Sequence, residues 1–322
     1  MVIKMKKIQY AAAMIADKCI SQIILVALVV FFAFQVRGIF FTINNLISIV
    51  RQVSTMGIAA LGVSFLMITG NLDFSMGAIY SFVGTFSAIL HLLDVYIALA
   101  MVIAVVCGIG ISCFTCWISI NFKIPRLISS MAMQQLINGL CVIVAGNKTI
   151  YGLPESIKWL GQGFIGIIPI STIIFVTLAV LVAFIFNKTY FGRYLFAVGG
   201  NEDVARLSGI NVNKIKYLSS VIAGALASIA GLVAMSRTFA GSPYAGGTLS
   251  TDVISAAVLG GVSIMGGTGK TSGLVTGILI IGTLTVGLNM MNMNTDAQNI
   301  FKGSMLLLAV VLDSRSKRIK KK

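Results

Sequence analysis

Long apolar segments alternate with short polar ones along most of the chain. A helix that crosses a membrane needs about 17–25 mostly apolar residues, and most of these segments reach that length. They occupy residues 20–36, 53–69, 76–92, 96–120, 127–145, 164–186, 217–235, 253–265, 272–291 and 300–312. The pattern predicts an all-α fold, a polytopic transmembrane helical bundle with about ten spans, of which 253–265 is short. No Pro- or Ser-rich linker divides the chain, so we expect one domain over residues 1–322.

Composition supports a membrane protein and argues against a nucleic-acid-binding one. Hydrophobic residues make up 57% of the chain and charged residues 10%, whereas soluble domains carry about 25% charged residues. The net charge of +15 does not indicate nucleic acid, because the basic residues gather beside the apolar segments. No small-residue cleavage site follows 20–36, so we expect this segment to be a retained span rather than a signal peptide.

The basic residues predict an orientation. An even number of spans places both ends on one side, and that side carries eighteen of them: Lys4, Lys6, Lys7, Lys18, Lys123, Arg126, Lys188, Arg193, Arg206, Lys214, Lys216, Lys270, Arg315, Lys317, Arg318, Lys320, Lys321 and Lys322. The other side carries six: Arg37, Arg51, Lys148, Lys158, Arg237 and Lys302. Since Lys and Arg are retained inside, we expect both termini, the loop 188–216 and the basic tail 314–322 to be cytoplasmic.

Residues 191–212, FGRYLFAVGGNEDVARLSGINV, form a charged island between two apolar segments. Gly199 and Gly200 allow a tight change of direction, and Asn201 can cap a helix of about two turns. Glu202 and Asp203 place negative charge at the positive end of that helix. Gly209 suits the left-handed residue that would end it.

The predicted helix has an apolar and a polar side. Val204 and Leu207 lie on one face, with Ala205 beside them, while Glu202 and Arg206 can form an i,i+4 ion pair. A helix of two turns is marginal in water, because its few hydrogen bonds do not recover the nucleation cost. The island is therefore either a solvated loop or a coupling helix that docks on a soluble partner.

The island resembles the cytoplasmic coupling loop of permease subunits in bacterial ATP-binding cassette sugar importers, in the ribose, xylose, galactose and allose branch. The matching residues are Phe191, Gly192, Arg193, Ala197, Gly199, Gly200, Asn201, Ala205, Arg206, Leu207, Ser208, Gly209, Ile210 and Val212. Val204 departs, since alanine is usual there. The resemblance implies that an ATPase is contacted through Gly199, Gly200, Asn201, Glu202, Ala205, Arg206, Leu207 and Gly209.

Two further blocks resemble the same family. Residues 70–77, GNLDFSMG, match its motif at Gly70, Asp73, Ser75 and Gly77. Asp73 is either an acid at membrane depth, which is a functional hypothesis by default, or part of a short cytoplasmic turn. Residues 252–269 begin with Asp252 and are rich in glycine, which predicts either a short broken span or a re-entrant pair of half-helices.

The segment 127–145 resembles the family least, and it carries Gln134, Gln135 and Asn138 within about one turn. These side chains either hydrogen-bond between helices or line the path of a polyhydroxylated solute. Together with Asp73 and Asp252 they are candidate substrate-path residues.

Two motifs are set aside. Cys113 and Cys116 form a C-x-x-C inside an apolar segment, with no second pair and His91 as the only histidine, so packing is the preferred interpretation. The string 266–273, GGTGKTSG, resembles a phosphate-binding loop, but Ile264 stands where the first glycine is required. We expect its glycines to support close helix contacts, as Ala223, Ala227 and Gly231 do at spacing four, and as Gly273 and Gly277 do.

The sequence thus indicates the membrane-spanning permease subunit of an ATP-driven importer for a monosaccharide, in the inner membrane of a bacterium. We expect no catalytic residue, no metal and no cofactor on this chain, with ATP and Mg²⁺ bound by a separate ATPase subunit. The resemblance implies further partners, namely an external solute-binding protein, periplasmic or lipid-anchored, and a second permease copy or paralogue. The alternatives are a nucleoside or branched-chain amino acid as cargo, and an ion-coupled secondary transporter.

Overall fold

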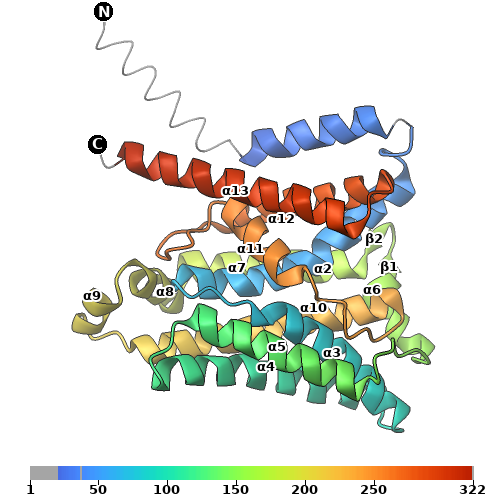
Figure 1. Ribbon diagram of the computed structural model, residues 1–322, viewed down its shortest axis with the longest axis horizontal. Helices are drawn as coiled ribbons and strands as arrows, with labels where there is room; N and C mark the ends of the chain where they lie inside the picture. Colours follow the sequence, from blue (N-terminus) through green and yellow to red (C-terminus); the bar gives the residue numbers. More distant parts are fainter. Residues whose placement is uncertain (1–20, 37, 321–322) are drawn as a thin grey trace, which may run out of the picture.

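The computed structural model describes residues 21–36 and 38–320, with side chains described up to residue 307. Helices that lie roughly parallel or antiparallel make up most of it (Figure 1). After the helical residues Ser21–Gln35 the elements are α2 (Ile43–Ile68), α3 (Ser75–Leu92), α4 (Ile97–Asn121), α5 (Arg126–Val144), η1 (Glu155–Ile157), α6 (Lys158–Gln162), β1 (Phe164–Ile165), β2 (Ile168–Pro169), α7 (Ile170–Lys188), α8 (Tyr190–Gly200), α9 (Glu202–Leu207), α10 (Val212–Thr238), α11 (Leu249–Leu259), α12 (Thr271–Met290) and α13 (Thr295–Lys320).

The all-α helical bundle is confirmed, and each predicted apolar segment coincides with a helix. Seven helices are long and apolar enough to cross a membrane, namely α2, α3, α4, α5, α7, α10 and α12. Ser21–Gln35 and α11 are shorter apolar helices, and α13 is 26 residues long with charged residues along it. The count of ten spans is therefore approximate.

Three local features differ from the apolar pattern. The first residues of segment 164–186 form an antiparallel hairpin, β1 and β2, because Gly166 with φ +62° permits a tight turn between the strands. Pro169 ends β2, and α7 begins directly after it. The segment 253–265 begins inside the eleven-residue helix α11 and ends in irregular backbone. Gly199 and Gly200, where a tight change of direction is expected, lie in the last turn of the helix α8.

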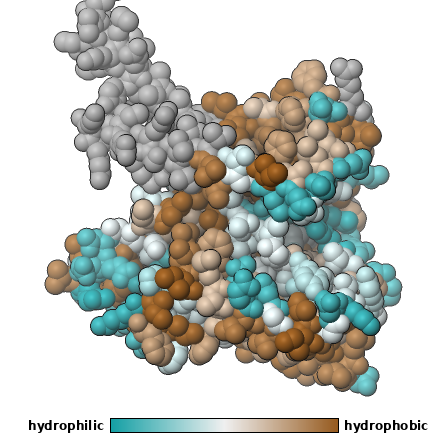
Figure 2. Space-filling model, in the orientation of Figure 1, coloured by the Kyte–Doolittle hydropathy of each residue, from teal (hydrophilic) through white to brown (hydrophobic). Residues whose placement is uncertain are grey.

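The bundle has two distinct ends, which Figure 1 places at left and right. The α9 end, at left, holds α8, α9, the start of α10 and the last turn of α13. The α6 end, at right, holds α6 and the β1–β2 hairpin. Hydrophilic side chains gather around α8 and α9, and apolar side chains cover the edge formed by α4 and α5 (Figure 2).

The helices form an inner and an outer layer. In α2, α3, α10 and α12 between 61% and 72% of the apolar window is buried, whereas in α4, α5 and α7 only 28% is buried. Small residues permit the close contacts of the inner helices, as expected. A Cβ on Gly231 of α10 would lie 2.4 Å from the carbonyl oxygen of Tyr80 in α3, and a Cβ on Gly277 of α12 would lie 1.9 Å from the carbonyl oxygen of Ala256 in α11.

We predict that Gly231→Ala destabilises the folded protein, by about 1–3 kcal/mol, because the methyl group would push α10 away from α3. The matched control is Gly110→Ala in α4, where a Cβ meets no atom within 4 Å. There alanine should be neutral or slightly stabilising, because it is the better helix former. Thermal unfolding of the purified protein in detergent measures both. Equal melting temperatures for the two variants would contradict the close contact.

Candidate functional site

The helix predicted after Asn201 is present as α9. The side-chain oxygen of Asn201 accepts hydrogen bonds from the backbone N–H groups of Asp203 and Val204, at 3.0 Å each. Gly209 has φ +81° and follows the last turn. Asn201 and Gly209 therefore begin and end α9 as the sequence indicates.

Gly199 and Gly200 serve a different purpose from the one expected. Both lie in the last turn of α8, and the chain changes direction at Asn201, whose backbone is extended at φ −164° and ψ 113°. A Cβ on Gly199 would lie only 1.7 Å from the carbonyl oxygen of Ile68. Gly199 is thus required for close approach of α8 to the end of α2, whereas Gly200 has no atom within 4 Å of such a position.

The polar side of α9 also differs from expectation. Glu202 forms an ion pair with Lys216 of α10 at 2.5 Å. The predicted i,i+4 pair between Glu202 and Arg206 is not among the ion pairs of the described residues. The Lys216 ammonium therefore fastens the start of α9 to the first turns of α10.

The apolar side of α9 is uncovered. Ala205 is buried against the bundle, whereas Val204 is 58% exposed and Leu207 is 88% exposed. A leucine so exposed at the tip of a short helix leaves apolar surface in contact with water, which is unfavourable. We call Val204 and Leu207 the α9 patch.

A cluster of glycines connects α8 to the rest of the bundle. The N–H of Gly267 donates to the carbonyl oxygen of Ile68 at 2.9 Å. Gly266, with φ +83°, packs its backbone against Gly70 and Gly199 at distances that leave no room for a Cβ. The glycines of string 266–273 therefore serve close backbone contact between α8, the end of α2 and the α11–α12 connection, which we call the glycine junction.

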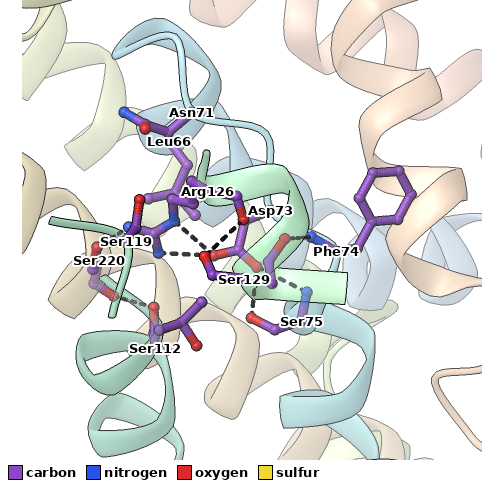
Figure 3. A network of polar contacts seen from close by, with 12 residues as sticks. Leu66, Asn71, Asp73, Phe74, Ser75, Ser112, Ser119, Arg126, Ser129 and Ser220 are labelled. Atoms are coloured by element: carbon purple, nitrogen blue, oxygen red, sulfur yellow. Dashed lines mark hydrogen bonds and ion pairs between the residues drawn. The ribbon is translucent and has the colours of Figure 1, made fainter. Parts of the chain in front are cut away.

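A buried ion pair lies a few residues further along the chain from this junction (Figure 3). Asp73 is fully buried, and one of its carboxylate oxygens accepts from Nε and Nη2 of Arg126 at 2.9 and 2.7 Å. Its other oxygen accepts from the backbone N–H and the hydroxyl of Ser75, at 2.8 and 2.5 Å. The remaining arm of Arg126 donates to the hydroxyl of Ser220 at 2.6 Å. The two charges are thus fully hydrogen-bonded, as burial requires.

The same turn is held by further hydroxyl groups. The N–H of Phe74 donates to Ser130 of α5 at 3.1 Å. Ser250, at the start of α11, donates to the carbonyl oxygen of Phe74 at 2.6 Å and accepts from the N–H of Gly77 at 2.8 Å. Residues 73–77 are therefore attached to α5, α10 and α11 together.

Asp252 lies in a second ion pair inside the bundle. Its carboxylate accepts from the ammonium of Lys302 in α13 at 2.8 Å, and both side chains are nearly buried. The hydroxyl of Thr248 lies 3.3 Å from the same oxygen. This pair connects the half-helix α11 to α13.

Two basic residues were therefore misplaced when Lys and Arg were assigned to loops. Arg126 was placed in the inner loops and Lys302 in the outer ones, yet both are buried in ion pairs within the bundle. Removing Arg126 from the inner side and Lys302 from the outer side lowers each count by one, so the excess of basic residues stays on the inner side. The sequence could have revealed the buried position of Lys302, because this charge stands within the apolar segment 300–312. Arg126, Ser220 and Ser250 gave no such signal.

Gln134, Gln135 and Asn138 all lie on α5, in its middle turns. Gln134 and Asn138 are half-buried and Gln135 is exposed. None of the three has a hydrogen-bond partner in the described part of the chain. They do not meet Asp73 or Asp252 in a single site.

A cavity of about 360 Å³ opens at the α6 end. It reaches from the rim of the bundle to the middle of α3 and borders the last two turns of α10. Its lining residues are Tyr80, Ser81, Gly84, Thr149, Tyr151, Gly231, Ala234, Met235, Arg237, Thr238, Ala240, Ser242 and Ala245. Sequence reasoning did not find it, since its walls come from segments far apart in the chain.

Among the residues described, Cys107, Cys113, Cys116 and Cys141 are free, and no group of three or more His, Cys, Asp or Glu side chains could hold a metal ion.

Apolar helices in two layers, seven of them long enough to cross a membrane, and paired charges inside the bundle are typical of a multi-pass membrane protein. The chain belongs to the family described as "Branched-chain amino acid transport system / permease component", which matches residues 45–310. It is 34% identical to the ribose import permease protein RbsC of Escherichia coli (strain K12), over 86% of this chain and 87% of that protein.

Two further relatives extend the comparison. RbsC of Bacillus subtilis (strain 168) is 33% identical, over 84% of this chain and 85% of its own length. The xylose transport system permease protein XylH of Haemophilus influenzae is 29% identical, over 93% of this chain and 96% of its own. No solved structure matches the chain.

We predict that Asp73→Ala destabilises the protein by about 3–5 kcal/mol, because it leaves the Arg126 guanidinium buried without its partner. Replacing Arg126 by Met in the same chain should recover part of that loss. Glu155→Ala is the matched control, since it breaks an ion pair with Lys158 at the exposed α6 end. Such surface pairs contribute about 0–1 kcal/mol. Thermal unfolding in detergent and the yield of monodisperse protein measure the effect, and an Asp73→Ala protein as stable as Glu155→Ala would refute it.

Proposed function

We propose that this chain is the permease subunit of an ATP-driven importer that moves a monosaccharide across the inner membrane of a bacterium. The observation that carries the proposal is its similarity, over most of its length, to permeases whose names specify ribose and xylose. The exposed α9 patch supports the coupling to a separate ATPase, because an apolar helix tip at the end of a membrane bundle needs a soluble partner to cover it. ATP and Mg²⁺ then bind the ATPase and not this chain.

The proposed orientation places the α9 end in the cytoplasm and the α6 end outside. The excess of Lys and Arg on the side of the α9 end supports it. An external solute-binding protein would then deliver the sugar at the α6 end. Both termini are cytoplasmic in this arrangement.

The contacts of α8 and α9 suggest how a push from the ATPase reaches the membrane helices. A docked α9 is fastened to α10 through Glu202 and Lys216. α8 touches the end of α2 and the α11–α12 connection through the glycine junction. Displacing α8 and α9 would therefore move the turn that carries Asp73, and with it the contacts to α5, α10 and α11. Switching between two such arrangements is alternating access.

A second permease copy or paralogue would cover α5. Gln135 is exposed in the middle of a membrane-spanning helix without a partner in the described chain, and a polar amide cannot face hydrocarbon at low cost. We propose that Gln134, Gln135 and Asn138 face a second subunit and line part of the solute's path. Asp73 and Asp252 would then position the helices around that path, since both carboxylates are engaged by basic side chains.

The description of the family favours one other cargo, a branched-chain amino acid. The importer would have the same kinds of subunit and the same coupling to ATP, and only the transported solute would differ. A nucleoside remains a third cargo without a specific observation in its favour. An ion-coupled secondary transporter would need an acid free to carry its ion, and the ion pairs of Asp73 and Asp252 argue against these two residues in that role.

We predict that Leu207→Asp uncouples the importer. The charge would face the apolar groove of the ATPase, so solute-stimulated ATP hydrolysis and sugar uptake should each fall about tenfold or more, as at interface anchor residues. The amount of inserted permease should not change, because Leu207 is 88% exposed. The matched control is Leu93→Asp, at an exposed leucine of the α6 end. Full uptake by Leu207→Asp in vesicles energised by an ion gradient and depleted of ATP would overturn the proposal.

The orientation has its own test, by labelling in intact cells. In a chain whose five cysteines are replaced, Lys214→Cys at the α9 end should be shielded from a membrane-impermeant maleimide, and Lys148→Cys at the opposite end should react. Breaking the cells open should expose Lys214→Cys. Labelling of Lys214→Cys alone in intact cells would reverse the orientation.

A further inference from the structure

The cavity at the α6 end contains hydrogen-bonding groups that none of the described residues satisfies. The hydroxyl groups of Tyr80, Thr149 and Tyr151 have no hydrogen-bond partner among the described residues. Arg237 uses one nitrogen, Nη1, to donate to Gln52 at 2.8 Å, and its Nε and Nη2 have no partner in the described chain. Polar groups inside proteins are normally hydrogen-bonded, and in an open cavity water or a bound solute can supply the partner.

Main-chain contacts border one wall of the cavity. There the N–H of Gly246 donates to the hydroxyl of Ser81 at 2.7 Å. Just beneath, a Cβ on Gly246 would lie 2.0 Å from the carbonyl oxygen of Gly77, so the two backbones touch. Below this contact lie Ser250 and the Asp73–Arg126 pair. The cavity is open at its rim, where the lining residues Tyr151, Thr238 and Ala245 are exposed.

The chemistry of the walls selects a class of solute. The only charged lining residue is Arg237, and no carboxylate lines the cavity. An amino acid would leave its ammonium group without an acceptor of opposite charge, which is costly in a partly dry site. A monosaccharide offers hydroxyl groups that can both accept from Arg237 and pair with tyrosine hydroxyls, and a volume of about 360 Å³ lies within the range of small-molecule pockets.

We infer that this cavity is a solute-binding site within a single protomer, that it takes a neutral polyhydroxylated monosaccharide from the α6 end, and that Tyr80 and Arg237 recognise its hydroxyl groups. The inference rests on the proposed function for the direction of transport, but not for the binding itself. The contact of Gly77 with Gly246 then closes the site on the α9 side.

Binding is tested on the full chain in membranes, without ATP or any partner. In a chain whose native cysteines are replaced, Ala245→Cys at the rim is labelled with a maleimide. D-Ribose or D-xylose at millimolar concentration should slow the labelling, by about threefold or more, whereas L-leucine at the same concentration should not. Adding Tyr80→Phe should weaken the protection, so that about 2–10-fold more sugar is needed for the same slowing. Tyr96→Phe, at an exposed tyrosine outside the cavity, should leave it intact. Labelling that neither sugar slows, or that L-leucine slows equally, would overturn the assignment.

Transport is tested in cells that carry the complete importer. Loss of one neutral hydrogen bond in Tyr80→Phe should lower uptake at subsaturating sugar about 2–10-fold, and loss of a charged donor in Arg237→Gln about 10–100-fold. Ala245→Phe should block uptake by filling the rim, whereas Ala245→Ser should not. Protection by sugar without any ATP-dependent uptake in the wild type would refute the proposed function and leave the site standing. Sugar uptake unaffected by Ala245→Phe and Tyr80→Phe would refute the site alone.

Discussion

The Asp73–Arg126 ion pair is the constraint on which the arrangement of the inner helices depends. Two opposite charges taken from water into a helical bundle are tolerated only when each lone pair and each N–H group finds a partner. Here those partners come from Ser75 at the start of α3 and Ser220 in α10. The need to satisfy one carboxylate therefore fixes the relative positions of α3, α5 and α10.

A second pair acts in the same way on the other side of the bundle. Asp252 and Lys302 join α11 to α13, and α11 is too short to span a membrane alone. The first turn of this half-helix is thus held twice, by Ser250 on the α3 turn and by Lys302 of α13 through Asp252. An irregular stretch, residues 239–248, precedes α11, and such backbone is tolerated at membrane depth when it borders a polar cavity. The cavity at the α6 end meets that condition, since Ala240, Ser242 and Ala245 line it.

The sequence predicts features that depend on local pattern. The apolar segments give the helices, Asn201 and Gly209 delimit α9, and small residues at spacing four mark close contacts in α10. Features that depend on distant partners were missed. Arg126 follows Pro125 at the edge of an apolar segment and resembles a loop residue, because its partner Asp73 lies 53 positions away. Gly199 and Gly200 suggested a turn, yet α8 continues through both. Gly199 is needed there because the backbone of Ile68, distant in sequence, leaves no room for a side chain. The cavity draws its walls from α3, α10 and two connections, which no local pattern brings together.

The glycine junction has a mechanical consequence. Where Gly199 meets Ile68 and Gly267, and where Gly273 of α12 meets Gly260, main chain lies directly against main chain. Side chains at an interface can yield by changing rotamer, so part of any displacement is lost as they rearrange. A contact between two backbones has no rotamer to change. A displacement of α8 is therefore transmitted to α2 and to the α11–α12 connection with little loss, because these backbones move together as one rigid unit.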